Sequence, residues 1–197
     1  QLLDRLQLDA AMQAFERNGF TWTFCATAAQ AADYIVSQCK GKKIGFGGSM
    51  TLDGLGVYEQ LKDQADVHWH WKGGDQLPKG DVFLTSANAL SATGETVNID
   101  GACNRIAASV HGFDACYVVC GINKLAPDLT SAMRRAREIA APLNAKRLNK
   151  RTPCAVDGKC HDCRSPERIC RAMTVVMAPP TGMSHYEIVV VGEELGY

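Results

Sequence analysis

The sequence predicts an α/β fold in which a mostly parallel sheet is covered by helices. Short apolar or alternating segments of strand length alternate along the chain with longer segments whose apolar residues recur at helical spacing. The chain has 197 residues, of which 46 % are hydrophobic, and this is enough for one domain with a substantial core. We therefore expect residues 1–197 to form a single α/β domain.

In the first half of the chain the strand and helix signals follow one another closely. Apolar residues recur at helical spacing before Gly19, and Thr27 has the side chain and the position of a helix N-cap. The expected elements are a helix over 2–19, a strand over 21–25, a helix from Thr27 to about Cys39, a strand over 42–47, a helix over 51–62, an extended segment over 67–71 and a buried strand over 82–86.

The second half continues this pattern with one interruption. We expect a strand over 96–99, a short helix over 104–111, an apolar strand over 116–120, a helix over 128–141 and late strands over 173–177 and 187–191. Residues 149–171 are polar, rich in cysteine and rich in turn residues. We therefore expect this segment to be an insert that lies outside the sheet.

Composition limits the classes of function. Lys+Arg and Asp+Glu both number 21, so the net charge is zero and gives no electrostatic case for nucleic acid or an anionic membrane as a partner. No window approaches the roughly 18 apolar residues of a membrane span. Charged residues near the start interrupt any export signal. We expect a cytoplasmic protein whose thiols at Cys25, Cys39, Cys103, Cys116 and Cys120 are reduced and buried.

A glycine loop follows the predicted strand over 42–47. Gly47, Gly48, Ser49 and Thr51 stand between this strand and the next predicted helix. Backbone N–H groups at such a turn can bind an anion, and glycine lets a ligand approach the backbone. The loop matches neither common nucleotide-binding motif. A tight turn with Ser49 or Thr51 as the helix cap explains it equally well.

Residues 85–101 form the richest polar stretch. It can offer hydrogen-bonding groups to a small polar ligand, with Glu95 as an acid, a base or a nucleophile and the nearby Arg105 as a clamp for a carboxylate or a phosphate. The alternative is a β-hairpin with Thr93, Gly94 and Glu95 at its turn. The residues themselves favour neither a particular reaction nor a particular ligand.

Four cysteines lie within 17 residues near the C-terminus, with the spacing C-x5-C-x2-C-x6-C. Four thiolates are a complete ligand set for an iron–sulfur cluster or for zinc. A single close pair within one short loop favours a [4Fe–4S] cluster, and nearby basic residues would offset its negative charge. Zinc, disulfides and free thiols remain open. The candidate ligands are Cys154, Cys160, Cys163 and Cys170.

Several motifs in their order resemble the LUD family of lactate-utilisation proteins. The matching segments are GGSMTL, TSANALSATGETVNIDGACNR, GINKLAPDL, APLNAKRL and VVVGEELGY, from about Ile44 to Tyr197. The resemblance implies a fold like those of ribose-phosphate isomerase, CoA transferases and formyltetrahydrofolate cyclo-ligase, with a ligand over the strand ends. One departure is Ala102-Cys103, where a glycine is expected. By position the resemblance points to Gly47, Gly48, Ser49, Thr51, Asn88, Glu95, Asn98, Asp100, Asn104 and Arg105.

The resemblance implies a component of lactate-type organic-acid redox metabolism. On this interpretation the chain binds a small anionic ligand and a [4Fe–4S] cluster and works alongside iron–sulfur partner proteins. It leaves open whether this subunit is itself catalytic, and whether it forms a homodimer. Two alternatives remain: a non-catalytic assembly or electron-transfer module with a structural zinc site, and an enzyme like a CoA transferase or ligase with Glu95 as nucleophile.

Overall fold

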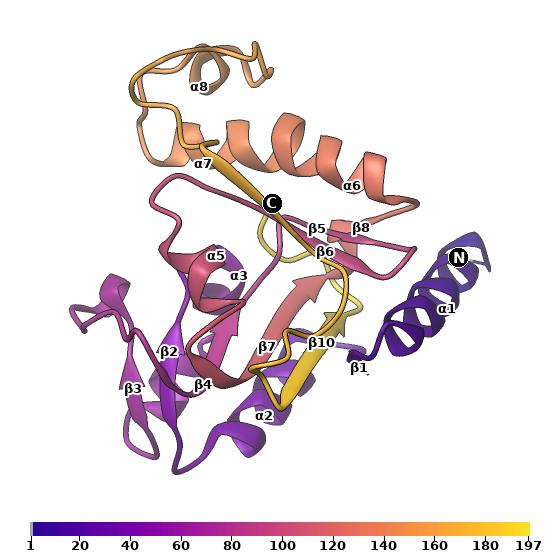
Figure 1. The fold of residues 1–197 in the computed structure, drawn as a ribbon, viewed down its shortest axis with the longest axis vertical. Helices are drawn as coiled ribbons and strands as arrows, with labels where there is room; N and C mark the ends of the chain where they lie inside the picture. Colours follow the sequence, from indigo (N-terminus) through magenta and orange to yellow (C-terminus); the bar gives the residue numbers. More distant parts are fainter. Residues whose placement is uncertain (1) are drawn as a thin grey trace.

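A computed structural model of the protein describes residues 2–197. Its centre is a six-stranded sheet in which every neighbouring pair of strands is parallel (Figure 1). The strand order is β1 (Thr21–Cys25), β10 (His185–Val191), β7 (Phe113–Gly121), β4 (Gly80–Thr85), β2 (Lys43–Phe46) and β3 (Asp66–His68). The predicted α/β class with a mostly parallel sheet is confirmed.

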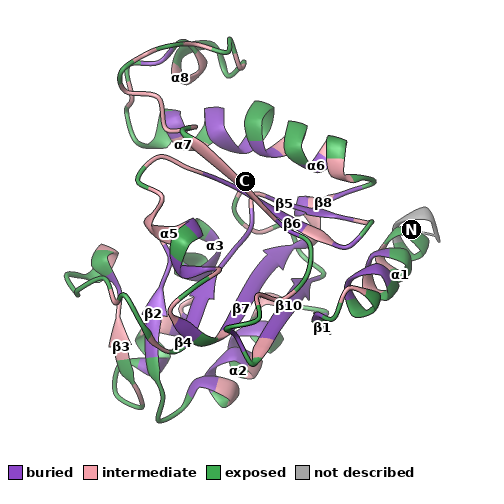
Figure 2. Cartoon of the chain, viewed as in Figure 1, coloured by how far each residue is buried: buried purple, intermediate pink, exposed green. Residues whose placement is uncertain are grey.

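The central strands are apolar on both faces, as strands covered by helices must be. Strand β7 is buried along most of its length (Figure 2). Its Tyr117 and Val119 belong to one core, and its Cys116 and Val118 belong to the other. The first core packs against α2 (Ala28–Cys39), α3 (Met50–Leu55) and α4 (Val57–Leu61). The second core includes Phe15 of α1 (Leu2–Arg17) and a smaller sheet. Side-chain alternation along each strand therefore supplies two cores.

The smaller sheet has the order β8 (Leu125–Ala126), β5 (Ala89–Ser91), β6 (Glu95–Asp100) and β9 (Ala172–Val176). Strands β5 and β6 form an antiparallel hairpin, and β9 adds antiparallel to β6. One face of this sheet packs on the second core. The other packs on α6 (Leu129–Arg135), the π-helical turn η3 (Ala136–Ala140) and α7 (Ala141–Arg147). The smaller sheet is thus a layer between the main sheet and a long helical segment.

Several boundaries differ from the predicted ones, and four of the differences change the course of the chain. The helix expected over 51–62 is broken at Gly56, whose φ of 67° ends α3. The helix expected over 128–141 continues to Arg147. In the segment expected to be extended over 67–71, strand β3 ends at His68. The chain then forms the 3₁₀ turn η1 (His70–Lys72). The helix expected over 104–111 is the shorter α5 (Asn104–Ala108). Helical periodicity alone does not mark such breaks.

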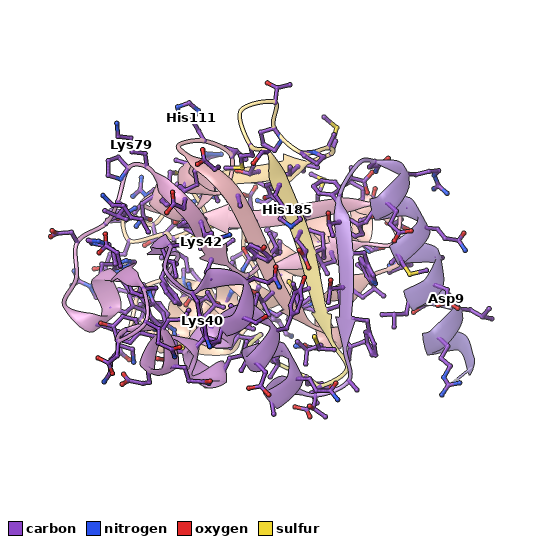
Figure 3. The ribbon with its side chains drawn as sticks, turned by 90° about the horizontal axis from the view of Figure 1, so that it is seen from below. Asp9, Lys40, Lys42, Lys79, His111 and His185 are labelled. Carbon is purple, nitrogen blue, oxygen red and sulfur yellow. The ribbon has the colours of Figure 1, made fainter. Side chains whose placement is uncertain are left out.

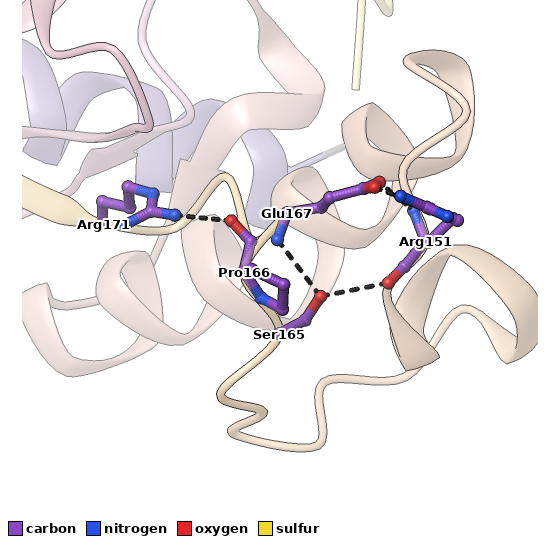
Figure 4. A network of polar contacts seen from close by, with 5 residues as sticks. All are labelled: Arg151, Ser165, Pro166, Glu167 and Arg171. Atoms are coloured by element: carbon purple, nitrogen blue, oxygen red, sulfur yellow. Dashed lines mark hydrogen bonds and ion pairs between the residues drawn. The ribbon is translucent and has the colours of Figure 1, made fainter.

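The cysteine-rich segment 149–171 contains one short helix, α8 (Pro153–Asp157), which contacts α7 (Figure 1). Its two ends are tied together (Figure 4). The Arg151 N–H and side chain donate to the Glu167 carboxylate at 2.7 and 2.6 Å, and Ser165 Oγ donates to the Arg151 carbonyl at 3.0 Å. Arg171 donates to the Pro166 carbonyl at 2.6 Å.

No helix within the described residues combines the length and apolar character needed to cross a membrane.

Candidate functional site: a cationic cavity at the carboxyl edge of the sheet

A cavity of about 620 Å³ lies at the carboxyl ends of four neighbouring strands. The segments that follow β2, β4, β7 and β10 each contribute to its wall: Gly48–Thr51, Ser86–Asn88, Lys124 and Gly196–Tyr197. In open parallel sheets this edge is where ligands bind, because the loops that leave the strands converge there. The topology therefore assembles the cavity from segments far apart in the sequence.

The opposite wall comes from the smaller sheet and the elements beyond it. Residues 99–102, at the end of β6 and just after it, line this wall with two residues of α5, the end of α7 and part of the cysteine-rich segment. His70 and Trp71 of η1 complete the wall. The cavity consequently lies between the main sheet and the layer formed by α7 and residues 149–171.

Positive charge dominates the wall of this cavity. Two carboxylates line it, Asp100 and Glu167, and Glu167 is bound by Arg151. Six Lys and Arg side chains also line it, and among the described residues none of the six has an Asp or Glu carboxylate within salt-bridge distance. Since the whole chain is neutral, this excess is local. The six are Arg105, Lys124, Arg147, Lys150, Arg168 and Arg171.

Lys124 is the most buried of these cations, with 3 % of its surface exposed. Its Nζ donates to the carbonyl oxygen of Ala87 at 3.3 Å and to the main-chain oxygen of Tyr197, the last residue of the sequence, at 2.7 Å. Burial lowers the pKa of the Lys124 ammonium to about 8, and the nearby Arg135 and Arg105 act in the same direction. Lys124 is thus a buried cation whose partners are main-chain oxygens and not acidic side chains.

Arg105 has a different arrangement of partners. Its Nη1 donates to Asn98 Oδ1 at 2.5 Å and to the Ser86 carbonyl at 3.4 Å, and its Nη2 donates to the Ile99 carbonyl at 2.7 Å. A longer contact of 3.4 Å joins Nη2 to Asn88 Oδ1. Burial lowers the pKa of the guanidinium. Arg105 therefore ties the loop after β4 to strand β6, and both of its Nη atoms are occupied by this task.

Asn88 and Asn98 interlock the same two segments. The Asn88 N–H donates to Asn98 Oδ1 at 3.1 Å, and the Ile99 N–H donates to Asn88 Oδ1 at 2.7 Å. Asn98 is buried and lies outside the cavity wall, whereas Asn88 lines it. These amides hold the Ser86–Asn88 segment in place, and this segment supplies the carbonyl that binds Lys124.

The glycine loop needs glycine because neighbouring side chains occupy the space that a Cβ would take. A Cβ at Gly47 would lie 2.9 Å from Thr85 Oγ1 and 3.0 Å from Arg105 Cγ, and a Cβ at Gly48 would lie 3.0 Å from the Trp71 ring. Ser49 caps α3 by accepting a hydrogen bond from the Leu52 N–H at 3.2 Å. Close packing and helix capping thus explain the loop.

A protein-family model of the LUD domain matches residues 8–191 of the chain. The chain belongs to the LUD-domain family. The solved structure of a DUF162-family protein from Deinococcus radiodurans shows the same fold, with a TM-score of 0.61 and 14 % sequence identity. That match covers 96 % of this chain and 98 % of the other. A search of curated proteins finds no significant match.

In this LUD domain the structure separates Glu95 from Arg105. Glu95 begins β6 and accepts a hydrogen bond from Thr93 Oγ1 at 2.6 Å, beside a turn at Gly94 that packs on α1. Arg105 binds the other end of the same strand. Glu95 is not part of the cavity wall. The hairpin alternative therefore describes this segment, and a catalytic role for Glu95 stays a prediction.

The other expected site residues divide between the cavity wall and its support. Seven line the cavity: Gly48, Ser49, Thr51, Asn88, Asp100, Asn104 and Arg105. Gly47 and Asn98 lie behind the wall. Within the Ala102-Cys103 pair, where the family resemblance led us to expect a glycine, Cys103 has a φ of 64°, in the left-handed region that favours glycine.

Of the six cations in the cavity wall, only Arg105 was predicted as a site residue. Lys124 lies in the GINKLAPDL motif directly after a buried strand, and that position was a usable signal. Arg168 and Arg171 are among the basic residues near the cysteines, which were predicted only to offset the charge of a metal cluster. Nothing in the sequence around Arg147, at the end of a helix, indicated that this side chain would line the cavity. Their convergence depends on contacts between distant segments.

The four clustered cysteines are free and partly exposed. Within residues 2–197 no three His, Cys, Asp or Glu side chains are grouped as ligands for a metal ion. Cys154 Sγ lies 3.4 Å from Thr152 Oγ1, and Cys170 Sγ accepts from Arg168 Nη2 at 3.4 Å. This arrangement does not fit a four-thiolate centre without rearrangement of the segment. The predicted [4Fe–4S] or zinc site therefore stays a prediction.

A second cavity of about 680 Å³ lies at the amino ends of the strands, the end seen in Figure 3, where His185 and Lys42 are labelled. It contains Glu187, which is buried and accepts hydrogen bonds from Thr23 and Tyr34 at 2.6 Å. His185 Nε2 lies 2.7 Å from the other carboxylate oxygen. Because the Glu187 carboxylate has three partners, it needs no ligand to balance it.

Proposed function

We propose that this LUD-domain protein is a component of lactate-type organic-acid metabolism that binds a small organic anion in the cationic cavity. The observation that carries the proposal is the buried Lys124, which lines the cavity and has no Asp or Glu side chain within salt-bridge distance in the described chain. A buried cation without a counter-ion is costly to the fold. An anionic ligand would supply the missing charge.

The local geometry supports this role for Lys124. A protonated ammonium has three hydrogens, and two of them are bonded to the carbonyls of Ala87 and Tyr197. The third is available to a carboxylate oxygen. The hydroxyls of Thr51 and Ser86, whose oxygens are 3.4 Å apart, line the same cavity and can donate to a ligand. The proposal assigns binding and leaves the reaction of the ligand open.

The two alternative functions have weaker support. A CoA-transferase type of mechanism with Glu95 as nucleophile needs Glu95 inside the cavity, and Glu95 lies outside its wall. A metal-dependent assembly module needs the four cysteines to come together, and in this arrangement they do not form a ligand group. The organic-anion proposal requires neither change.

The proposal is tested by measuring lactate and pyruvate binding to the full chain by calorimetry. Because the pKa of Lys124 in the free protein is about 8, the affinity should be constant below pH 7 and should fall about tenfold per pH unit above pH 8, until the higher pKa of Lys124 in the complex is reached. Lys124→Met should abolish this binding at pH 7. Lys40→Met, which removes an exposed lysine from the end of α2, is the matched control.

Circular dichroism would establish that the Lys124→Met protein is folded, and the pH profile of the unmodified protein needs no variant. An affinity that is the same in Lys124→Met, or that does not change between pH 7 and 10, would remove Lys124 from the site. An absence of binding by every anion tested would contradict the proposed function itself.

A further inference from the structure

The cavity is large for a three-carbon acid. Its volume is about 620 Å³, and a water molecule in the liquid takes about 30 Å³. The space therefore corresponds to about twenty non-hydrogen atoms, whereas lactate has about six. Lactate alone would leave most of the cavity filled with water.

The positive charges of the cavity fall into two groups by depth. Lys124 and Arg105 form the inner group, at the ends of the parallel strands. The outer group comes from α7 and from the segments around the cysteines, and its members are Arg147, Lys150, Arg168 and Arg171. A single carboxylate held at Lys124 would leave the outer group without a partner.

The outer arginines bond only to neutral groups. Arg147 donates through Nε and Nη2 to Asn144 Oδ1, and its guanidinium lies 5.1 Å from the centre of the Trp71 ring. Arg171 donates to the Arg168 carbonyl and to the Pro166 carbonyl (Figure 4). These contacts fix the guanidinium groups in position and leave their charges unbalanced.

Arg168 gives an independent indication of a missing acceptor. Its Nη1 donates to the Cys163 carbonyl at 2.8 Å and its Nη2 to Cys170 Sγ at 3.4 Å. Its Nε is buried and has no hydrogen-bond partner in the described part of the chain. Buried donors in proteins are nearly always paired. Because Arg168 lines the cavity through other atoms of its side chain, a rotation of that side chain would bring its Nε–H to a ligand oxygen.

We propose that the ligand of this cavity carries at least two anionic groups, one bound at Lys124 and one at the outer arginines Arg147, Arg168 and Arg171. The ligand is an organic phosphate or a polycarboxylate of more than six non-hydrogen atoms. This inference rests on the proposed anion-binding function and specifies its ligand class. Guanidinium groups suit both chemistries, because they bind phosphate and carboxylate oxygens in pairs.

The test compares probes of different charge on the full chain by calorimetry at constant pH and ionic strength. Lactate and acetate carry one negative charge, whereas citrate and adenosine monophosphate carry two or more. We expect the multivalent probes to bind about tenfold tighter or more. The affinity ratio between citrate and adenosine monophosphate separates polycarboxylate from organic phosphate as the preferred source of charge.

The variant pair Arg147→Gln and Arg168→Gln tests the second binding position. Each should weaken the preferred multivalent probe about tenfold and leave lactate binding nearly unchanged. Arg134→Gln, an exposed arginine of α6 outside the cavity wall, is the matched control. Because Arg147 is exposed, its replacement is not expected to impair folding.

Equal affinities for monovalent and multivalent probes would overturn this inference while leaving anion binding in place. So would multivalent binding that both variants retain in full. If no probe binds, the proposed function fails together with the inference. If Arg147→Gln weakens lactate and citrate binding by equal factors, both probes bind at one common site. That result would also overturn the proposed second binding position.

Discussion

Lys124 connects the stability of the fold to its ligand. Its ammonium is buried and hydrogen-bonded to two carbonyls, and burial is the main cause of a pKa near 8. A lysine whose folded pKa lies below its unfolded value of about 10.5 destabilises the folded state while it is protonated. An anion that accepts a hydrogen bond from the ammonium and balances its charge would remove this cost.

The pH dependence of unfolding tests this account of Lys124. Below pH 8 the lysine is protonated in both states, and its full cost is present. Between pH 8 and 10.5 the unfolded state binds more protons, so the free energy of unfolding should rise, by on the order of 3 kcal/mol from this group. Other groups titrate in the same window. We therefore expect the difference between the unmodified protein and Lys124→Met to show the rise, as measured by urea unfolding at each pH. A difference that is flat across the window would contradict it.

The ends of the parallel strands decide where the wall segments of the cavity lie. After β7, Gly121 allows the segment 192–197 to approach closely. Asn123 holds this segment by accepting from the Leu195 N–H at 3.0 Å, and Lys124 binds its Tyr197 carbonyl. A Cβ at Gly121 would lie 2.6 Å from the Glu193 carbonyl oxygen, closer than real Cβ contacts come. The position needs glycine because backbone occupies the space.

Replacement of this glycine should therefore be costly. We expect Gly121→Ala to lower the free energy of unfolding by about 1–3 kcal/mol through overpacking and to weaken anion binding by displacing residues 192–197. Gly54→Ala in α3 is the control, since nothing lies within 4 Å of its Cβ position. It should be neutral or stabilising by up to about 1 kcal/mol. Chemical unfolding of both variants measures the contrast. Equal stability of the two would show that the segment shifts freely.

Across the molecule, the cysteine-rich segment 149–171 is the part whose predicted chemistry and observed arrangement differ most. Its spacing favours a four-thiolate centre, yet the described side chains form no ligand group of three or more. Four clustered thiols outside the core contrast with Cys39 and Cys116, where burial raises the pKa of each thiol to about 12 and makes it unreactive. We infer that metal binding requires the segment to rearrange.

Metal analysis of protein purified without oxygen tests this inference. If the four cysteines bind a [4Fe–4S] cluster, the protein should contain about four iron and four sulfide per chain and absorb near 400 nm. Cys160→Ser should lose the metal. Cys103→Ser, at a partly exposed cysteine outside the segment, should retain it. One zinc per chain would support the zinc site and contradict the cluster. A folded protein without metal would contradict both.

Local sequence patterns predicted much of the fold. The boundaries of β1 and the N-cap of α2 at Thr27 agree with the predicted ones. Strands β7 and β10 were visible as apolar runs because both of their faces are buried. The strand β9 was predicted as an element, but its place as the antiparallel partner of β6 in a second sheet was not. Register between strands far apart in the chain has no local signal.

The amino-acid sequence by itself determined the order and kind of most elements, the family to which the chain belongs and the loops that would follow the parallel strands. Periodicity and capping are local properties, and a sequence displays them directly. Only the tertiary structure decided that Lys124, Arg147 and Arg168 share one cavity and that Glu95 lies outside it. Their convergence is produced by strand order and by the packing of α7 and residues 149–171, which depend on contacts over long sequence separations.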